Sequence, residues 1–205
     1  PSPTFTCVAE DNMIRSDTTL EKMASLKPAF DKKYGTLTAG NSSPLTDGAS
    51  AALIADEQRA KELGLKPKSR ILDCLFLGVN PTEQLLIGPA LAIPQLLKRQ
   101  KLSIQDIDLF EIHEAFAAQT LSCLKSMESD EFCQRHFGDN AIGRIPDEKL
   151  NVNGGAIAIG HPFGATGVRL VTTLSNELIR QDKKLGLIGI CTAGGMAGAM
   201  LIERM

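Results

Sequence analysis

The sequence contains no tryptophan and only one tyrosine, and it has no long apolar run and no block of like charges. With so few large aromatic side chains, a surface that stacks nucleic-acid bases is not expected. The net charge of −2 gives no electrostatic reason to expect nucleic acid as a partner either. No apolar stretch reaches the roughly 20 residues that a membrane-spanning helix needs, so we expect no membrane span.

Paired cysteine motifs are also missing. The five cysteines are an odd number and include no Cys-x-x-Cys: Cys7, Cys74, Cys123, Cys133 and Cys191. This usage argues against a disulfide framework and a structural zinc site, so we expect no metal and a reducing compartment. Residues 1–5 show neither an initiator methionine nor a signal-peptide pattern, which suggests that the chain starts within a longer protein.

Strand-like and helix-like segments alternate from residue 69 onward. We predict strands at 70–79, 107–112, 185–191 and 196–202, and helices at 89–100, 114–127 and 168–180. The alternation indicates an α/β fold with a mixed, mostly parallel sheet packed between helices. A short glycine turn joins the last two strands, so this pair should be antiparallel. No repeat of 20–50 residues is present, which excludes a solenoid.

The remaining segments are less regular. Residues 18–26 and 56–63 have helical spacing. The small, apolar run 49–55 fits either a buried strand or a tightly packed helix. Residues 130–149 are polar and irregular, and His136 within them is expected to be solvated.

A glycine-rich stretch at 151–169 is the most unusual part of the sequence, because it holds five of the eighteen glycines around His161. Glycine opens backbone conformations that other residues avoid and allows close approach of other groups. Pro162 disfavours the helical region for His161, which we therefore expect on a shaped turn just before a helix. A titratable side chain at such a junction indicates chemistry.

Three polar groups are predicted at the carboxyl ends of strands, where open α/β sheets bind ligands: His113, His161 and Cys191. A thiol and two imidazoles that converge there suit proton transfer and oxyanion stabilisation. Structural interpretations stay open for each residue. Cys191 could be a buried strand cysteine, His113 a polar residue at a helix start, and His161 a structural part of the turn.

Several familiar motifs are incomplete. Residues 155–160 have the glycine spacing of a P-loop, but His161-Pro162 replaces the required lysine and hydroxyl residue. Residues 113–117 begin like a zinc-protease helix and lack the second histidine. No Gly-x-Gly-x-x-Gly follows a predicted strand. Nucleotide hydrolysis, zinc proteolysis and dinucleotide redox chemistry are therefore disfavoured.

Four motifs together resemble the thiolases, in the order and approximate spacing of that family and across nearly the whole chain. They are Asn41-Ser-Ser-Pro-Leu-Thr-Asp-Gly48, His113-Glu-Ala-Phe-Ala117, Gly160-His-Pro-Phe-Gly-Ala-Thr-Gly167 and Cys191-Thr-Ala-Gly-Gly195. The His-Glu-Ala-Phe form and Phe163 are similar to the long-chain 3-ketoacyl-CoA thiolases of the β-oxidation trifunctional complex. The implied reaction is CoA-dependent cleavage of 3-ketoacyl-CoA to acetyl-CoA and a shortened acyl-CoA.

The resemblance implies catalytic roles for three side chains and one backbone group. His161 would activate a nucleophilic thiol and point one nitrogen into an oxyanion hole. His113 would complete that hole, through a water, and Cys191 would move a proton at the α-carbon of acetyl-CoA. The backbone N–H of Ala193 would contribute to a second oxyanion hole.

The resemblance also implies binding residues and partners. Ser43 would contact the pantetheine arm of CoA, and Phe116 would wall the tunnel that holds it. CoA would be a co-substrate, with no permanently bound cofactor. A homodimer of the full-length thiolase is expected, together with a possible hydratase/dehydrogenase subunit. The location would be cytoplasmic for a bacterial protein and mitochondrial for a eukaryotic one.

One departure from the family pattern is large, because no cysteine lies in the glycine/serine-rich helix start that carries the thiolase nucleophile. The chain therefore resembles the last part of a thiolase, with residues 1–66 as the tail of the N-terminal domain and 67–205 as the C-terminal domain. We expect it to be inactive alone. The alternatives are a non-catalytic module that binds CoA or assists assembly, and a biosynthetic ketoacyl synthase. The synthase is disfavoured because such enzymes lack a cysteine at the position of Cys191.

Overall fold

A computed structural model of the chain describes residue 7 and residues 9–205. The chain divides into two compact units, residues 1–40 and 41–205. In the first unit, α1 (Leu20–Ala24) begins at Thr19, whose hydroxyl accepts a hydrogen bond from the Lys22 backbone N–H. This helix is shorter than the predicted 18–26. None of its residues is buried, so no packing extends it beyond its capped turn.

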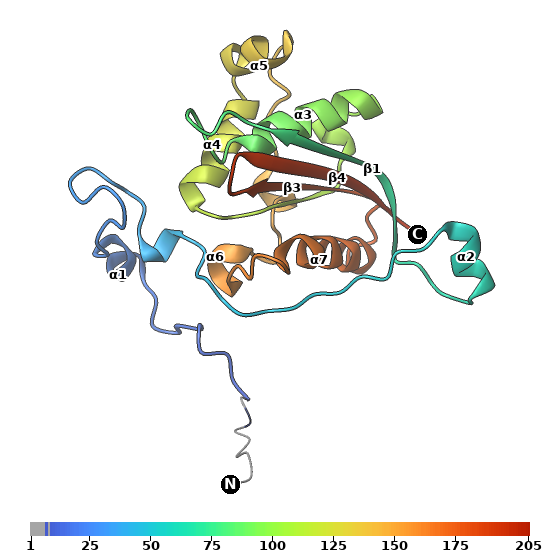
Figure 1. Ribbon diagram of the computed structural model, residues 1–205, viewed down its shortest axis with the longest axis horizontal. Helices are drawn as coiled ribbons and strands as arrows, with labels where there is room; N and C mark the ends of the chain where they lie inside the picture. The colour runs from blue at the N-terminus through green and yellow to red at the C-terminus, as the bar shows by residue number, and fades with distance from the viewer. Residues whose placement is uncertain (1–6, 8) are drawn as a thin grey trace. The chain divides into compact units, whose positions relative to one another are not determined.

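The second unit is built on a four-stranded sheet: β1 (Ser69–Gly78), β2 (Leu109–Ile112), β3 (Leu185–Thr192) and β4 (Met196–Arg204). The strand order is β1-β4-β3-β2 (Figure 1). The last two strands are antiparallel, as predicted, and β2 and β3 are parallel. The sheet is mixed, as expected, but the expectation that most neighbouring strands are parallel is wrong. Since β4 runs between β1 and β3 against both, two of the three pairs are antiparallel.

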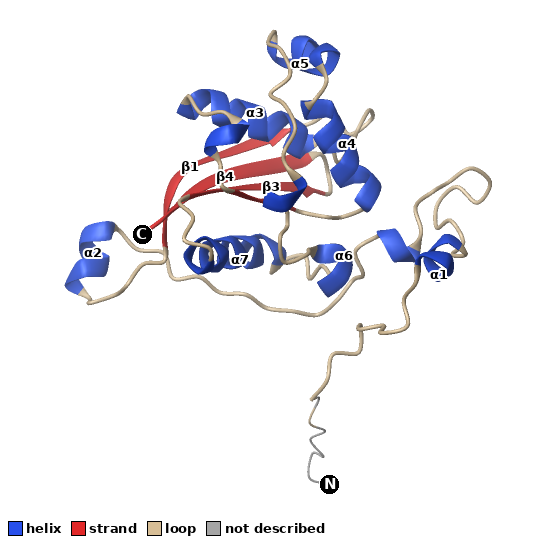
Figure 2. Ribbon diagram, turned by 180° about the vertical axis from the view of Figure 1, so that it is seen from behind, coloured by secondary structure: helices blue, strands red, loops and turns tan. Residues whose placement is uncertain are grey.

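Helices cover both faces of this sheet (Figures 1 and 2). Alternation along β3 and β4 sends Leu187 and Leu201 to one face and Ile188 and Ile202 to the other. The first face packs against α3 (Gly88–Gln100) and α4 (Ala117–Met127), and the second packs against α7 (Thr166–Arg180). Each fully buried leucine contributes roughly 1.5–3 kcal/mol relative to an exposed one. The predicted sheet between helices is confirmed.

Several local predictions were wrong. Residues 130–149 were predicted to be irregular but contain α5 (Asp130–Phe137), which the Ser129 hydroxyl caps and Gly138 ends in the left-handed region. The run 49–55 is neither strand nor helix. It is an almost fully exposed loop in which Leu53 is 81% exposed, because none of the described strands and helices covers it. The glycine-rich stretch also contains a short helix, α6 (Ala156–Ile159).

The remaining helical segments are short. They are α2 (Glu57–Glu62) and the 3-10 turns at Ala39–Asn41, Ile104–Asp106 and Asp147–Lys149. Helix α2 lies within the predicted 56–63, and the Asp56 side chain caps its first turn. Among the described residues, no helix is long and apolar enough to cross a membrane.

Candidate active site

The carboxyl ends of β2 and β3 lie side by side, because these two strands are parallel and in register from Leu109 to Ile112. His113 directly follows β2, and its backbone N–H donates a 2.9 Å hydrogen bond to the carbonyl oxygen of Gly189 in β3. Cys191 stands two residues further along β3. The structure therefore brings these two predicted residues to the same end of the sheet.

His161 reaches this region through a turn that depends on glycine. Gly160 has a φ of 93°, a conformation that residues with a side chain rarely adopt. A Cβ atom at Gly160 would also lie 2.4 Å from Thr46 Cγ2. The backbone N–H of His161 then donates to the carbonyl oxygen of Pro44 at 2.9 Å. The segment around Pro44 and Thr46 thus fixes the path of the chain into His161.

The two imidazole rings are in contact. The ring centroids of His113 and His161 are 4.1 Å apart, and the planes are tilted by 44°. The centroid of the Phe163 ring lies 4.7 Å from that of His161, and Phe163 is 71% exposed. Although 48 residues separate them in the sequence, the histidines form one paired group.

The neutral form of both imidazoles is favoured, because His113 is buried and His161 is partly buried beside a positive charge. His113 is 1% exposed, and within the described part of the chain neither of its ring nitrogens has a hydrogen-bond partner. Burial lowers its pKa to about 3, and the positive charges of His161 and Arg169 act in the same direction. Burial and the Arg169 charge also lower the pKa of His161. At neutral pH the pair can therefore offer neutral N–H donors and one basic nitrogen.

Thr166 determines which nitrogen of His161 carries the proton. Its Oγ1 lies 2.7 Å from His161 Nδ1 and 3.1 Å from the carbonyl oxygen of Pro162. A carbonyl oxygen only accepts, so the hydroxyl donates its single proton to Pro162 and accepts from Nδ1–H. Nε2 is then left with a lone pair that can take a proton.

Cys191 lies in a different environment from the histidines. The side chain is 5% exposed, and burial raises the pKa of its thiol to about 12. The thiol therefore stays protonated at neutral pH, and among the described residues no hydrogen bond joins it to either imidazole. Ala193, two residues later, is exposed in the turn between β3 and β4, where Gly194 and Gly195 have positive φ.

The two predicted CoA-binding residues lie next to each other. Ser42 and Phe116 form an isolated β-bridge, and both the backbone N–H and the hydroxyl of Ser43 donate to the carbonyl oxygen of Ala115. The same segment continues to Pro44, the hydrogen-bond partner of the His161 backbone. Ser43 and Phe116 therefore border the histidine pair on the side of the 41–46 segment.

Sequence reasoning missed an ion pair close to the histidines, between a partly buried arginine and a buried glutamate. Arg169, in the first turn of α7, has its Nη1 3.5 Å from Oε2 of Glu111, which is 1% exposed. Burial raises the pKa of Glu111 to about 7, although the Arg169 charge opposes this shift. Arg169 lies inside the glycine-rich stretch, and its position eight residues after His161 was the one available signal.

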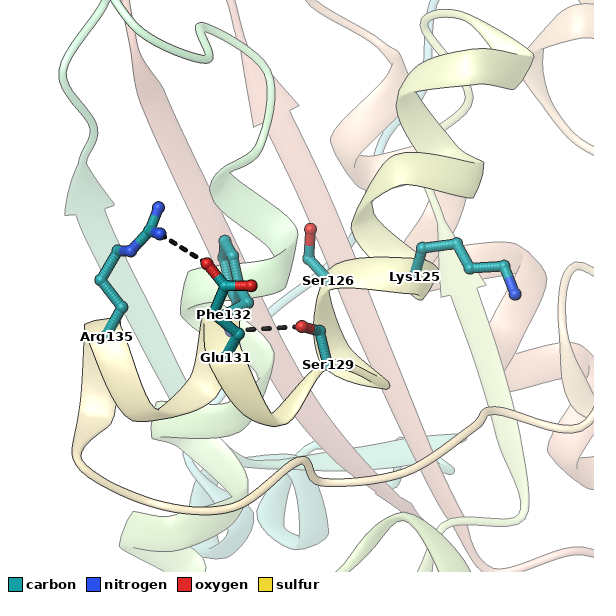
Figure 3. Close-up of a pocket in the computed structure, with 6 residues that line it drawn as sticks. All are labelled: Lys125, Ser126, Ser129, Glu131, Phe132 and Arg135. Atoms are coloured by element: carbon teal, nitrogen blue, oxygen red, sulfur yellow. Dashed lines mark hydrogen bonds and ion pairs between the residues drawn. The ribbon is translucent and has the colours of Figure 1, made fainter.

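A pocket of about 290 Å³ lies elsewhere, between the end of α4 and α5 (Figure 3). It is lined by Lys125, Ser126, Ser129, Glu131, Phe132 and Arg135. The Lys125 and Arg135 side chains are largely exposed, and Arg135 pairs with Glu131 at 2.9 Å. None of the predicted site residues lines this hollow, which is therefore separate from the histidine pair.

Comparisons with known proteins agree with the motifs. The family model described as "Thiolase, C-terminal domain" matches residues 65–204, and "Thiolase, N-terminal domain" matches residues 2–58. A probable 3-ketoacyl-CoA thiolase of Caenorhabditis elegans is 51% identical over 96% of this chain and 44% of its own length. The mitochondrial trifunctional enzyme subunit beta of Bos taurus is 49% identical over 96% of this chain and 41% of its own.

Solved structures agree as well. The chain resembles the Bacillus anthracis acetyl-CoA acetyltransferase with a TM-score of 0.82 and 41% identity, over 96% of this chain and 45% of that one. Human mitochondrial 3-ketoacyl-CoA thiolase in complex with CoA gives a TM-score of 0.80 and 38% identity, over 95% and 45% of the two chains. The chain spans less than half the length of the two curated relatives. The family-model match over residues 65–204, together with the similar fold, shows that the chain belongs to the thiolase family.

Proposed function

We propose that this chain carries the acid/base and oxyanion-binding part of a 3-ketoacyl-CoA thiolase. The overall reaction would be cleavage of 3-ketoacyl-CoA by CoA to acetyl-CoA and an acyl-CoA shortened by two carbons. The observation that carries this proposal is the contact between the rings of His113 and His161, in which buried His113 has no hydrogen-bond partner on either ring nitrogen among the described residues. Buried donors of this kind suit an anionic oxygen that forms during the reaction.

The proposed role of His161 follows from its tautomer. With Nδ1–H bonded to Thr166, its Nε2 accepts the proton of an attacking thiol. Once protonated, the same nitrogen donates to the thioester oxygen as negative charge develops there. His113 supplies the second donor, through a water. Removal of one such donor typically costs on the order of 10²–10³ in rate.

Cys191 would act as the acid in the cleavage direction. When the bond between the α- and β-carbons breaks, the two-carbon fragment leaves as an enolate of acetyl-CoA. The Cys191 thiol, protonated because its pKa is about 12, gives its proton to that carbon. The incoming CoA thiol then returns a proton to Cys191, and its sulfur takes the shortened acyl group from the nucleophilic thiol. The released thiolate recovers the proton that His161 had accepted. The N–H of Ala193, in the adjacent turn, would bind the other anionic oxygen, which forms when the nucleophilic thiol adds to the 3-keto carbon.

Ser43 and Phe116 would border the pantetheine arm of CoA, which acts as a co-substrate and not as a resident cofactor. Their position beside the segment that holds His161 supports this assignment. The similar human mitochondrial thiolase was solved in complex with CoA, which is an observation on that protein and supports CoA as the ligand proposed for this one.

Residues 1–66 would be the last part of a thiolase N-terminal domain and 67–205 the C-terminal domain. The two family matches, at 2–58 and 65–204, support this division. Large apolar side chains on both parts also support it, since Leu53 is 81% exposed and Phe76 on β1 is 74% exposed. The nucleophilic thiol would come from residues outside the 205, within a homodimeric thiolase that a hydratase/dehydrogenase subunit could join.

The test is a thiolysis assay on the 205-residue chain alone and after mixing with the N-terminal half of a related thiolase. We expect no turnover alone, turnover in the mixture, and its loss with Cys191→Ala. Turnover by the isolated chain that Cys191→Ala abolishes would refute the need for an external nucleophile.

The second candidate is a non-catalytic CoA-binding module, and the observation that favours it is the state of the remaining cysteines. Cys123 and Cys133 are buried, Cys7 and Cys74 are exposed, and none of the four belongs to the histidine pair's strand ends. CoA binding measured by calorimetry, with no thiolysis in any mixture and no effect of His161→Ala on binding, would favour this module.

A further inference from the structure

Two polar side chains beside the histidine pair, Asn151 and Glu114, join the end of β2 to the segment that leads to His161. Glu114 directly follows His113, and Asn151 begins the glycine-rich stretch. Asn151 Nδ2 donates a 2.9 Å hydrogen bond to Glu114 Oε1. The two side chains therefore connect the two segments that carry the imidazoles.

Asn151 extends the sheet with its side chain. Its backbone N–H donates to the carbonyl oxygen of Phe110 at 2.8 Å, next to the parallel bridge between Phe110 and Leu150. Its side-chain amide then makes the hydrogen bonds to β2 that a backbone peptide group would otherwise make. Oδ1 accepts from the N–H of Ile112 at 2.8 Å, and Nδ2 donates to the Ile112 carbonyl oxygen at 2.9 Å. The N–H and the carbonyl oxygen of Ile112, the residue before His113, are thus both hydrogen-bonded to the Asn151 side chain.

The backbone of Asn151 explains why an asparagine occupies this position. Its φ is 45°, in the left-handed region where asparagine is among the few tolerated residues. In that conformation the chain turns away from β2, and the backbone alone cannot continue the pairing. The side-chain amide has the same donor and acceptor as a peptide group, so it replaces the missing strand residue.

Glu114 makes the connection to His161. Its Oε2 accepts a 3.3 Å hydrogen bond from the N–H of Ile157 in α6, the helix that ends one residue before Gly160. A Cβ atom at Gly155 would lie 2.5 Å from this same oxygen, so the close approach of the carboxylate requires a glycine there. The carboxylate of the residue after His113 is thus bonded to the helix that precedes His161.

We propose that Asn151 and Glu114 are positioning residues that set the separation of the His113 and His161 rings. This inference deepens the proposed function, on which its catalytic meaning rests. Neither side chain has to touch the substrate. Each acts through an imidazole, because a shift of the β2 end or of α6 moves one ring relative to the other. A misplacement of about 1 Å at a reacting group costs on the order of 10²-fold in rate.

The experiment uses NMR of the 205-residue chain with isotope-labelled histidine, comparing wild type with Glu114→Gln and Asn151→Asp. Glutamine can still accept from Asn151, but its NH₂ group then faces the Ile157 N–H. Aspartate keeps the bond from the Ile112 N–H and loses both donated bonds. Glu148→Gln, at an exposed position in the same part of the chain, is the matched control. Exposed His136 is the internal reference.

We expect the ring-proton NOE between His113 and His161 to be strong in wild type and in Glu148→Gln, and to be lost in Glu114→Gln and Asn151→Asp. The His136 signals should not move. Circular dichroism identifies any variant that has unfolded, and the milder Glu114→Gln keeps the test decisive if Asn151→Asp does not fold. A folded Glu114→Gln with the wild-type NOE would overturn the proposal.

The geometric readout also separates this inference from the proposed function. In a mixture that supports thiolysis, Glu114→Gln should lower kcat by on the order of 10²-fold with little change in KM. If the NOE is lost in the variants but no mixture shows turnover, the positioning role stands and the proposed function fails. A variant that only lowers the melting temperature, with the NOE unchanged, would assign both residues a purely structural role.

Discussion

Thr166→Val tests the assignment of the His161 tautomer. Valine has nearly the same shape as threonine and removes only the hydroxyl, which is the acceptor for Nδ1–H. Thr166 is 1% exposed, so water cannot easily replace that acceptor. The carbonyl oxygen of Pro162 loses little, because it also accepts the backbone N–H of Thr166 at 3.0 Å. The main effect of the substitution is therefore the loss of the hydrogen-bond acceptor for His161 Nδ1–H.

The magnitude follows from the cost of an unpaired donor. A part-buried N–H that loses its acceptor costs about 1–3 kcal/mol, and this is the expected decrease in the free energy of unfolding. The preference for the Nδ1–H tautomer over the Nε2–H tautomer should decrease by the same free energy. Each 1.4 kcal/mol is about tenfold in an equilibrium constant, so the tautomer ratio should fall by roughly tenfold.

The assay is ¹⁵N NMR of the histidine rings, in which protonated and unprotonated ring nitrogens have well-separated shifts. Thr166→Ser is the matched control, because it keeps the hydroxyl and should keep Nδ1–H on His161. If the valine variant is folded and shows the same ring shifts as wild type, Thr166 does not determine the tautomer and the reasoning is wrong.

Three further predictions concern the surroundings of the histidine pair. Arg169→Met removes the positive charge that helps to lower the pKa of His161, so its NMR titration midpoint should rise; an unchanged midpoint would exclude this electrostatic effect. Gly160→Ala introduces a Cβ at a φ of 93° and should reduce the free energy of unfolding by about 1–3 kcal/mol in a denaturant titration, whereas Gly164→Ala, with nothing within 4 Å, should be nearly neutral. Glu111 has a pKa raised from its ordinary value of 4.5 to about 7, so the folded state binds one proton more than the unfolded state between these pH values. Stability should therefore fall by about 1.4 kcal/mol per pH unit across that window, and Glu111→Gln should remove this slope in unfolding measured as a function of pH.

The main elements of the second unit could be predicted because their apolar periodicity is long and agrees with their packing. Helix α7 buries Leu170, Leu174 and Leu178 at four-residue spacing, and this pattern is visible in the sequence. Helix α5 could not be identified in this way, because Cys133 is its only buried residue and the helix has just over two turns. Its Ser129 cap and its final glycine were the available signals. The exposed run 49–55 gave the opposite error, since apolar composition alone does not supply a covering partner.

The strand pattern predicted where His113 would lie, but it was wrong to place His161 at a strand end, because His161 follows helix α6; nor did it predict that the two rings would touch. Strand order and register bring His113 beside β3, whereas the path into His161 depends on contacts with Pro44 and Thr46, more than a hundred residues earlier in the chain. Local spacing contains no information about such distant contacts. The pairing of the two imidazoles is therefore a property of the tertiary fold.

The chemical state of the pair is further removed from the sequence than its position. A histidine identified by motif could be a charged donor or a neutral base, and burial decides between these by disfavouring the charged form. Two residues in the first turn of α7 also determine the state of His161. Thr166 fixes which ring nitrogen carries the proton, and the positive charge of Arg169 disfavours a positive charge on the His161 ring. Both residues belong to the same helical turn that begins after the glycine-rich turn at Gly160. The glycine-rich turn at Gly160 therefore has a second role, because it places the start of α7 beside the His161 imidazole. A substitution that shifted the start of α7 by one residue would keep every motif residue and still change the protonation of His161.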